Sequence, residues 1–182
     1  MKIATFNINN VNKRLRNLVA WLENAKPDVV CLQELKATDS EFPLTALERA
    51  GYGGVWRGQK SWNGVAILAR GCEPVVTHTT LPGEPADTQS RYIEAAVNGV
   101  LIGTLYAPNG NPQPGPKFKY KLAWMQRSDR VDPALIEETF EKRPSLGLHE
   151  RVILVGFRRV NVRICWHDIV IPCQHDWRAE AV

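Results

Sequence analysis

The 182-residue sequence has no apolar run near the roughly 20 residues that a membrane-spanning helix requires. Its N-terminus does not show the charged and apolar pattern of a signal peptide. Its four cysteines show no CxxC spacing, which argues against zinc-ribbon and redox motifs. We therefore expect a cytoplasmic protein with reduced thiols and no membrane partner.

Signatures of nucleotide and zinc binding are absent as well. Gly110 and Gly115 do not form a P-loop, because no GxxxxGK[ST] pattern occurs. The four histidines lack the spacing of zinc proteases, so a zinc enzyme is not favoured. No internal repeat or low-complexity segment appears. The length predicts one domain with a substantial core.

The net charge of +4 is concentrated in the first two thirds of the chain. Residues 1–127 carry a net charge of +5, whereas residues 128–182 carry −1. A basic excess of this size permits a polyanionic partner such as nucleic acid. An ordinary mixed-charge surface explains it equally well.

Apolar periodicity predicts a chain that begins strand–helix–strand and continues mainly as strands. A half-buried strand is expected at 2–9, a helix at 11–22, a buried strand at 29–35 and a short helix at 42–50. Further strands are expected at 65–68, 73–80, 91–97 and 100–106, the last two joined by an Asn-Gly hairpin turn. After a proline-rich loop at 107–116, a helix begins near 117; later elements are predicted at 132–142, 151–155 and 160–173.

A carboxylate stands at the end of the buried strand. Glu34 is either a rim residue paired with Lys36 or a ligand for a hard cation such as Mg²⁺, which prefers oxygen ligands. The amide of Asn7, on the neighbouring strand, could join such a site or merely satisfy backbone groups at a strand end. Beside a metal, Arg91 becomes a candidate phosphate clamp, although an arginine at a strand start is usually a surface residue.

Aromatic residues are a further candidate feature. Trp56, Trp62, Tyr106 and Trp124 could stack on nucleobases, although a tryptophan more often fills a core with its N–H satisfied. The residue types alone leave both interpretations open.

Five segments in order carry a specific resemblance. They are 1–9 (MKIATFNIN), 27–36 (PDVVCLQELK), 62–68 (WNGVAIL), 89–93 (QSRYI) and 106–110 (YAPNG). Together they resemble the exonuclease III family of the endonuclease/exonuclease/phosphatase superfamily. The resemblance runs continuously over about residues 1–127.

The resemblance implies an α/β fold in which a two-layer β-sandwich is flanked by helices, incomplete here. It implies a DNA phosphodiesterase that uses Mg²⁺, with Mn²⁺ as a second option, to remove nucleotides from 3′ ends and to incise abasic sites. Asn7 and Glu34 would belong to the metal site and Tyr106 would be the catalytic tyrosine. Arg91 and Asn109 would contact DNA phosphate. The implied partner is double-stranded DNA with abasic sites or 3′ ends, bound by a monomer.

The resemblance ends after residue 127, where the family continues to a strand that ends Gly-Asp-Phe-Asn. Residues 152–159 read VILVGFRR, so that Phe157 and two arginines replace the Asp and Asn that orient the attacking water in the family. The His-Asp pairs at 167–168 and 175–176 have the reverse order of the family's final motif and are not assigned.

Two parts of different character are therefore predicted within the chain. Residues 1–127 would form the N-terminal part of the family domain, and residues 128–182 a divergent or frame-shifted tail. Sequencing the gene tests the frame-shift hypothesis. The chain is expected to be an impaired DNA-repair nuclease; the alternatives are an inactive remnant that binds DNA weakly and a phosphatase of the same superfamily.

Overall fold

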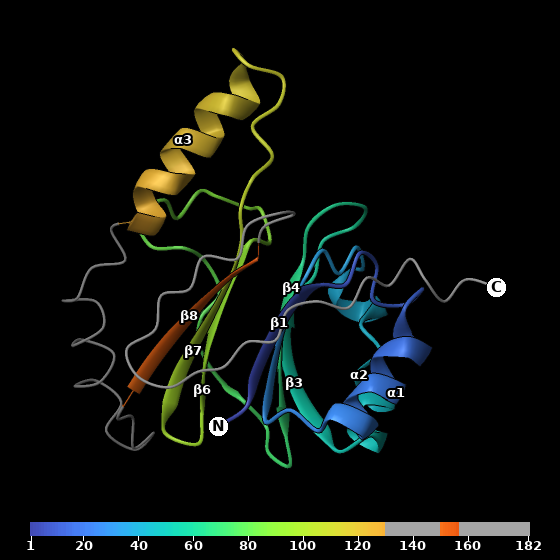
Figure 1. Ribbon diagram of the computed structural model, residues 1–182. Coiled ribbons are helices and arrows are strands. Elements are labelled where there is room, and N and C mark those ends of the chain that lie inside the picture. The colour runs from blue at the N-terminus through green and yellow to red at the C-terminus, as the bar shows by residue number, and fades with distance from the viewer. Residues whose placement is uncertain (130–149, 157–182) are drawn as a thin grey trace.

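The computed structural model describes residues 1–129 and 150–156, which form two four-stranded sheets (Figure 1). The first sheet has the order β1 (Ile3–Asn7), β2 (Val29–Gln33), β4 (Val65–Arg70), β3 (Tyr52–Arg57). The second has the order β5 (Val75–His78), β6 (Tyr92–Val97), β7 (Val100–Tyr106), β8 (Glu150–Gly156). β1 and β2 are parallel, as are β7 and β8, and the other neighbours are antiparallel. The predicted α/β sandwich is confirmed.

The sheets face each other across an apolar core. β2 is buried along its whole length, which explains why its sequence, VVCLQ, is almost continuously apolar. Side chains such as Cys31 and Ile67 of the first sheet lie in one cluster with Ile93 and Ile102 of the second. Burying each large aliphatic side chain contributes about 1.5–3 kcal/mol, so this contact fixes how the sheets meet.

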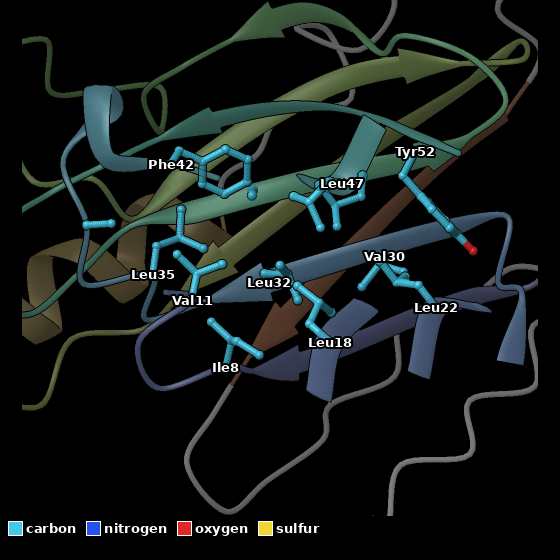
Figure 2. Close-up of a cluster of buried hydrophobic side chains, with 13 residues drawn as sticks. Ile8, Val11, Leu18, Leu22, Val30, Leu32, Leu35, Phe42, Leu47 and Tyr52 are labelled. Atoms are coloured by element: carbon cyan, nitrogen blue, oxygen red, sulfur yellow. The ribbon is translucent and has the colours of Figure 1, made fainter. Parts of the chain in front are cut away.

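The outer face of the first sheet is covered by two helices, α1 (Leu15–Ala25) and α2 (Leu44–Arg49), with the short 3₁₀ helix η1 (Asp39–Glu41) before the second. Figure 2 shows this second cluster, in which Leu18 and Leu22 of α1 and Leu47 of α2 pack with Val30 and Leu32 of β2. A third cluster joins the fourth helix, α3 (Pro116–Asp129), to the second sheet through Trp124, Tyr92 and Leu105.

The predicted helix starts later, and the predicted buried strand ends earlier, than their apolar patterns indicate. The helix begins at Leu15 rather than Val11, because the Val11 N–H donates to the carbonyl of Leu35 (3.0 Å) and Asn10 turns the chain through its Oδ1, which accepts from the Lys13 N–H (3.0 Å). The buried strand ends at Gln33, because Glu34 has the left-handed φ of 56°. The chain therefore leaves the sheet at Glu34.

The strand predicted at 151–155 is confirmed as β8. It pairs in parallel with β7 over its whole length, from Val100 opposite Glu150 to Tyr106 opposite Gly156. It therefore covers the edge of β7, which the first 127 residues alone would leave unpaired. The elements predicted at 132–142 and 160–173 lie outside the described residues, as does Phe157.

Candidate active site

Polar side chains from both sheets meet at one edge of the sandwich. Asn7 ends β1 and pairs with Gln33, so Glu34 follows directly beside it, while Tyr106 ends β7 of the other sheet. The Tyr106 hydroxyl donates a hydrogen bond to Oε1 of Glu34. In Figure 1 this is the upper end of the sandwich, below α3. Three of the predicted site residues are therefore brought together by the packing of the sheets.

Glu34 is a buried carboxylate that is well supplied with donors. Its side chain is 5% exposed, and Nζ of Lys36 lies 3.1 Å from Oε2. Burial works to raise the pKa of Glu34, but hydrogen bonds from Tyr106, Asn7 and Lys36 outweigh burial and lower the pKa below its ordinary value. Glu34 is therefore an anion at neutral pH.

The pair with Lys36, one of the two interpretations of Glu34 left open by the sequence, is only part of its surroundings. The pair with Lys36 exists, and Lys36 also donates to Oδ1 of Asn9 (2.6 Å). A simple rim pair, however, does not account for the contacts with Asn7 and Tyr106 at a carboxylate that is almost fully buried. Such a concentration of donors around one buried acid is typical of a functional site.

Asn7 contacts Glu34 through its amide nitrogen. A carboxylate only accepts hydrogen bonds, so the bond that helps to lower the Glu34 pKa comes from the amide NH₂ group of Asn7. The amide oxygen accepts from the backbone N–H of Asn9 (3.0 Å). The amide nitrogen, rather than the oxygen expected as a metal ligand, therefore faces Glu34, and Asn7 orients the carboxylate.

Arg91 lies against Tyr106. Its guanidinium carbon is 5.1 Å from the centre of the Tyr106 ring, and its Nη1 donates to the Tyr106 carbonyl (3.2 Å). Its Nε donates to Oε1 of Gln89 (2.7 Å). Burial lowers the pKa of Arg91, and the nearby Tyr120, Tyr106 and Asp87 act in the opposite direction. The guanidinium remains charged at neutral pH. Arg91 therefore supports the tyrosine whose hydroxyl reaches Glu34.

A second polar cluster lies next to Arg91, and sequence reasoning missed it. Asp87 accepts hydrogen bonds from the Tyr120 hydroxyl (2.9 Å) and from Nη2 of Arg127 (2.8 Å). Burial and the bond to Asp87 raise the pKa of Tyr120 to about 12, so that its hydroxyl stays protonated. Asp87, Tyr120 and Arg127 adjoin a cavity of about 580 Å³. No motif marks these three residues, which belong to a loop and a helix.

Asn109, the fifth predicted site residue, stands apart. It is exposed in the loop after β7, and its Oδ1 accepts from the backbone N–H of Asn111 (3.4 Å). The structure thus groups Asn7, Glu34, Tyr106 and Arg91 and leaves Asn109 on the loop beside them.

The Glu34 carboxylate is a candidate oxygen ligand for a hard cation. Within residues 1–129 and 150–156, no three His, Cys, Asp or Glu side chains are grouped so as to hold a metal. A single carboxylate is compatible with Mg²⁺, which keeps several waters and commonly uses one or two protein carboxylates.

No helix in the described part of the chain is long and apolar enough to cross a membrane.

A sequence model of the endonuclease/exonuclease/phosphatase family matches residues 4–156, most of the chain. The chain belongs to this family. Exodeoxyribonuclease III of Haemophilus influenzae is 41% identical over 110 residues, which are 60% of this chain and 40% of that protein. The exonuclease III resemblance is confirmed.

Solved structures of this family are similar to the chain. A 3′-5′ exonuclease of Neisseria meningitidis has a TM-score of 0.70 at 39% identity, covering 85% of this chain and 57% of that one. An AP endonuclease of Archaeoglobus fulgidus has a TM-score of 0.68 at 33% identity, covering 85% and 56%. A Neisseria 3′ phosphatase bound to a product DNA hairpin has a TM-score of 0.68 at 38% identity, covering 85% and 56%. The chain thus spans less than two thirds of each of these relatives.

Proposed function

We propose that this family member descends from, and retains the metal-binding half of, an exonuclease III-type DNA phosphodiesterase. The observation that carries the proposal is the bond from the Tyr106 hydroxyl to the buried Glu34 carboxylate at the sheet edge. The reaction is hydrolysis of DNA phosphodiesters, at 3′ ends and at abasic sites, in base excision repair. Similarity to an exodeoxyribonuclease III and to an AP endonuclease supports it.

Each grouped residue has a role in this reaction. Glu34 would hold the cation, Mg²⁺ or Mn²⁺, which when bound polarises a phosphoryl oxygen and stabilises the leaving oxygen. The Asn7 amide would present an N–H donor where negative charge develops on the phosphate. The Tyr106 hydroxyl, whose one proton is donated to Glu34 in this structure, would turn to the phosphate when DNA binds. Arg91 packs against the Tyr106 ring and would add positive charge close to the bound phosphate. Asn109, which is exposed on the loop after β7, would contact the DNA backbone.

The partner is double-stranded DNA that contains abasic sites or 3′ ends. The net charge of +5 over residues 1–127 supports a polyanion, and a similar Neisseria protein is bound to a DNA hairpin. We expect a cytoplasmic monomer.

Cleavage by this chain should be weak. The last described residue of β8, Gly156, pairs with Tyr106. After Gly156 the sequence has Phe157, Arg158 and Arg159 in place of the Asp and Asn expected from the resemblance. Loss of the group that activates water should reduce the rate by about 10²–10⁴-fold. A tail of different origin, predicted over residues 128–182, would then begin after residue 156, where the family match ends.

An assay of abasic-site incision and 3′ resection tests the proposal. A labelled duplex is incubated with the full chain and Mg²⁺, with Glu34→Gln and a chelator as controls. Slow cleavage that both controls abolish supports the proposal, and turnover close to that of a full-length relative refutes the predicted impairment. Cleavage that Glu34→Gln leaves unchanged would refute the role of Glu34.

Two alternatives have an observation in their favour. The residues after Gly156 favour a non-catalytic remnant, for which the assay would show salt-sensitive DNA binding without cleavage. Similarity to a Neisseria 3′ phosphatase favours release of a 3′-terminal phosphate, which a 3′-phosphorylated duplex in the same assay would detect.

A further inference from the structure

Trp62 is an exposed tryptophan at the edge that carries the candidate active site. It is 72% exposed, the highest value among the large apolar side chains of the described residues that lie at the surface. By contrast, Trp124 is 1% exposed, and Trp56 stacks on Phe42 and donates its indole N–H to the Asp39 carbonyl (3.1 Å). Trp124 lies in one core cluster and Trp56 packs against another, whereas Trp62 has no structural explanation of that kind.

The loop that carries Trp62 is hydrogen-bonded to the segment of Glu34. This loop, residues 58–64, joins β3 to β4. The backbone N–H of Leu35 donates to the Gly64 carbonyl (3.2 Å), and that of Lys36 donates to the Asn63 carbonyl (3.0 Å). The backbone next to Trp62 is therefore held beside the segment that carries the Glu34 carboxylate.

Lys36 links the indole to the carboxylate. Its Nζ lies 5.9 Å from the centre of the Trp62 ring and 3.1 Å from Oε2 of Glu34. These two distances together place the ring within about 9 Å of the carboxylate. A base stacked on Trp62 would thus lie close to a phosphate that is bound through a cation at Glu34.

The loop is also fixed to the second sheet. Nδ2 of Asn63 donates to Oε1 of Gln59 (2.7 Å), which accepts in turn from the Ser90 N–H (2.9 Å). The Ser90 hydroxyl donates to the Gly58 carbonyl (2.8 Å). Because the base of the loop is held at several points, the indole is presented with little backbone freedom. A ligand that stacks on it pays a small ordering cost.

We propose that Trp62 is a stacking platform for an unpaired nucleobase next to the phosphate at Glu34. The inference rests on the proposed function, since it requires a DNA strand at that carboxylate. A flat apolar ring beside a lysine matches a nucleotide, which offers a π-face and an anionic phosphate. Every base has such a face, so the contact selects an unpaired base over an abasic residue without selecting the base type. Frayed 3′ ends are the DNA structures that present one.

A binding measurement without catalysis tests this. The full chain is titrated, in EDTA and low salt, with fluorescein-labelled single strands of equal length: one of thymidine nucleotides, the other of tetrahydrofuran abasic nucleotides. Both carry the same phosphates, and only the first has bases. We expect the thymidine strand to bind about tenfold more tightly, Trp62→Ala to remove that preference, and Trp62→Phe to retain part of it.

Val75→Ala is the matched control, because Val75 is also an exposed apolar side chain but lies on β5, opposite Ala96. It should keep the preference for the thymidine strand. Equal binding of both strands to the unmodified chain, or a preference that survives in Trp62→Ala, overturns the stacking role while DNA binding stands. Binding of neither strand overturns the DNA partner and the stacking role with it.

Discussion

The Tyr106 hydroxyl donates a hydrogen bond to the Glu34 carboxylate, joining residues 72 positions apart at the ends of strands from opposite sheets. Neither side chain alone defines the site, because the contact exists only when β7 and β2 are packed across the core. A change in the packing of the two sheets should therefore break the Tyr106–Glu34 hydrogen bond before it unfolds the chain.

Removing the tyrosine hydroxyl should change the ionisation of Glu34. In Tyr106→Phe we expect the pKa of Glu34 to rise toward 4.5, since the Tyr106 hydrogen bond is the largest of the effects that lower it. Titration of ¹³C-labelled glutamate carboxyls by NMR measures this. Tyr52→Phe is the control, because Tyr52 donates to the Pro27 carbonyl instead and should leave Glu34 unchanged. An unchanged pKa of Glu34 in Tyr106→Phe would contradict the assigned contact.

Lys36 should oppose metal binding at Glu34. Its ammonium lies 3.1 Å from the carboxylate, and a cation that binds there must overcome its charge. A unit charge about 5 Å from a divalent ion costs about 1–2 kcal/mol in water, so Lys36→Met should tighten Mn²⁺ binding about tenfold. Titration followed by electron paramagnetic resonance measures the affinity. Lys13→Met is the charge-matched control, and equal affinities in the two variants would place the metal away from Glu34.

The sequence predicted the chemistry of the site better than its arrangement. Asn7, Glu34 and Tyr106 follow strands, and their grouping could be expected from their places at strand ends together with the family resemblance. The hairpin predicted between 91–97 and 100–106 also places Arg91 opposite Tyr106. The contact of the Arg91 guanidinium with the Tyr106 ring could not be predicted, because no sequence pattern indicates the direction of these side chains. Sequence indicates which residues end strands, but not which side chains then meet.

The contacts of Asp87 show a different limit. Tyr120 and Arg127 lie 33 and 40 positions away, on a helix whose apolar pattern gives no sign of a partner for either. The strands of the core were predictable because burial imposes a period on every residue. An isolated polar contact imposes none, so only the folded chain reveals it.

Breaking the Asp87 cluster should destabilise the fold. Nε and Nη1 of Arg127 are buried and have no hydrogen-bond partner among the described residues, so Asp87 provides the principal compensation for its charge. We expect Asp87→Asn to lower the free energy of unfolding by about 1–3 kcal/mol, measured by urea denaturation. Glu84→Gln, in the same loop but exposed, should change it by less than about 0.5 kcal/mol. Equal effects would show that Asp87 contributes no more than an exposed surface charge.

Stability should fall in acid. Burial acts to raise the pKa of Asp87, but the bonds from Arg127, Gln89 and Tyr120 lower it overall, as donors lower that of Glu34. The folded carboxylates thus bind protons less readily than the unfolded ones, whose ordinary pKa values are 3.8 and 4.5. Their stabilisation is fully present well above pH 4.5 and is lost as the pH falls through the folded values. Urea midpoints between pH 7 and pH 3 measure this; a smaller acid loss in Asp87→Asn is expected.

Gly64 links the Trp62 loop to the carboxylate, and its replacement should affect both. It has φ +99°, and a Cβ there would lie 2.7 Å from Cβ of Leu35, the residue after Glu34. Gly71 also has a positive φ, of +72°, but a Cβ there would meet nothing within 4 Å. Gly71→Ala should therefore cost only the backbone penalty of about 1–2 kcal/mol in unfolding free energy, and Gly64→Ala clearly more. Only Gly64→Ala should also move the Glu34 titration. Equal costs and an unchanged titration would mean that the loop and the Glu34 segment move independently.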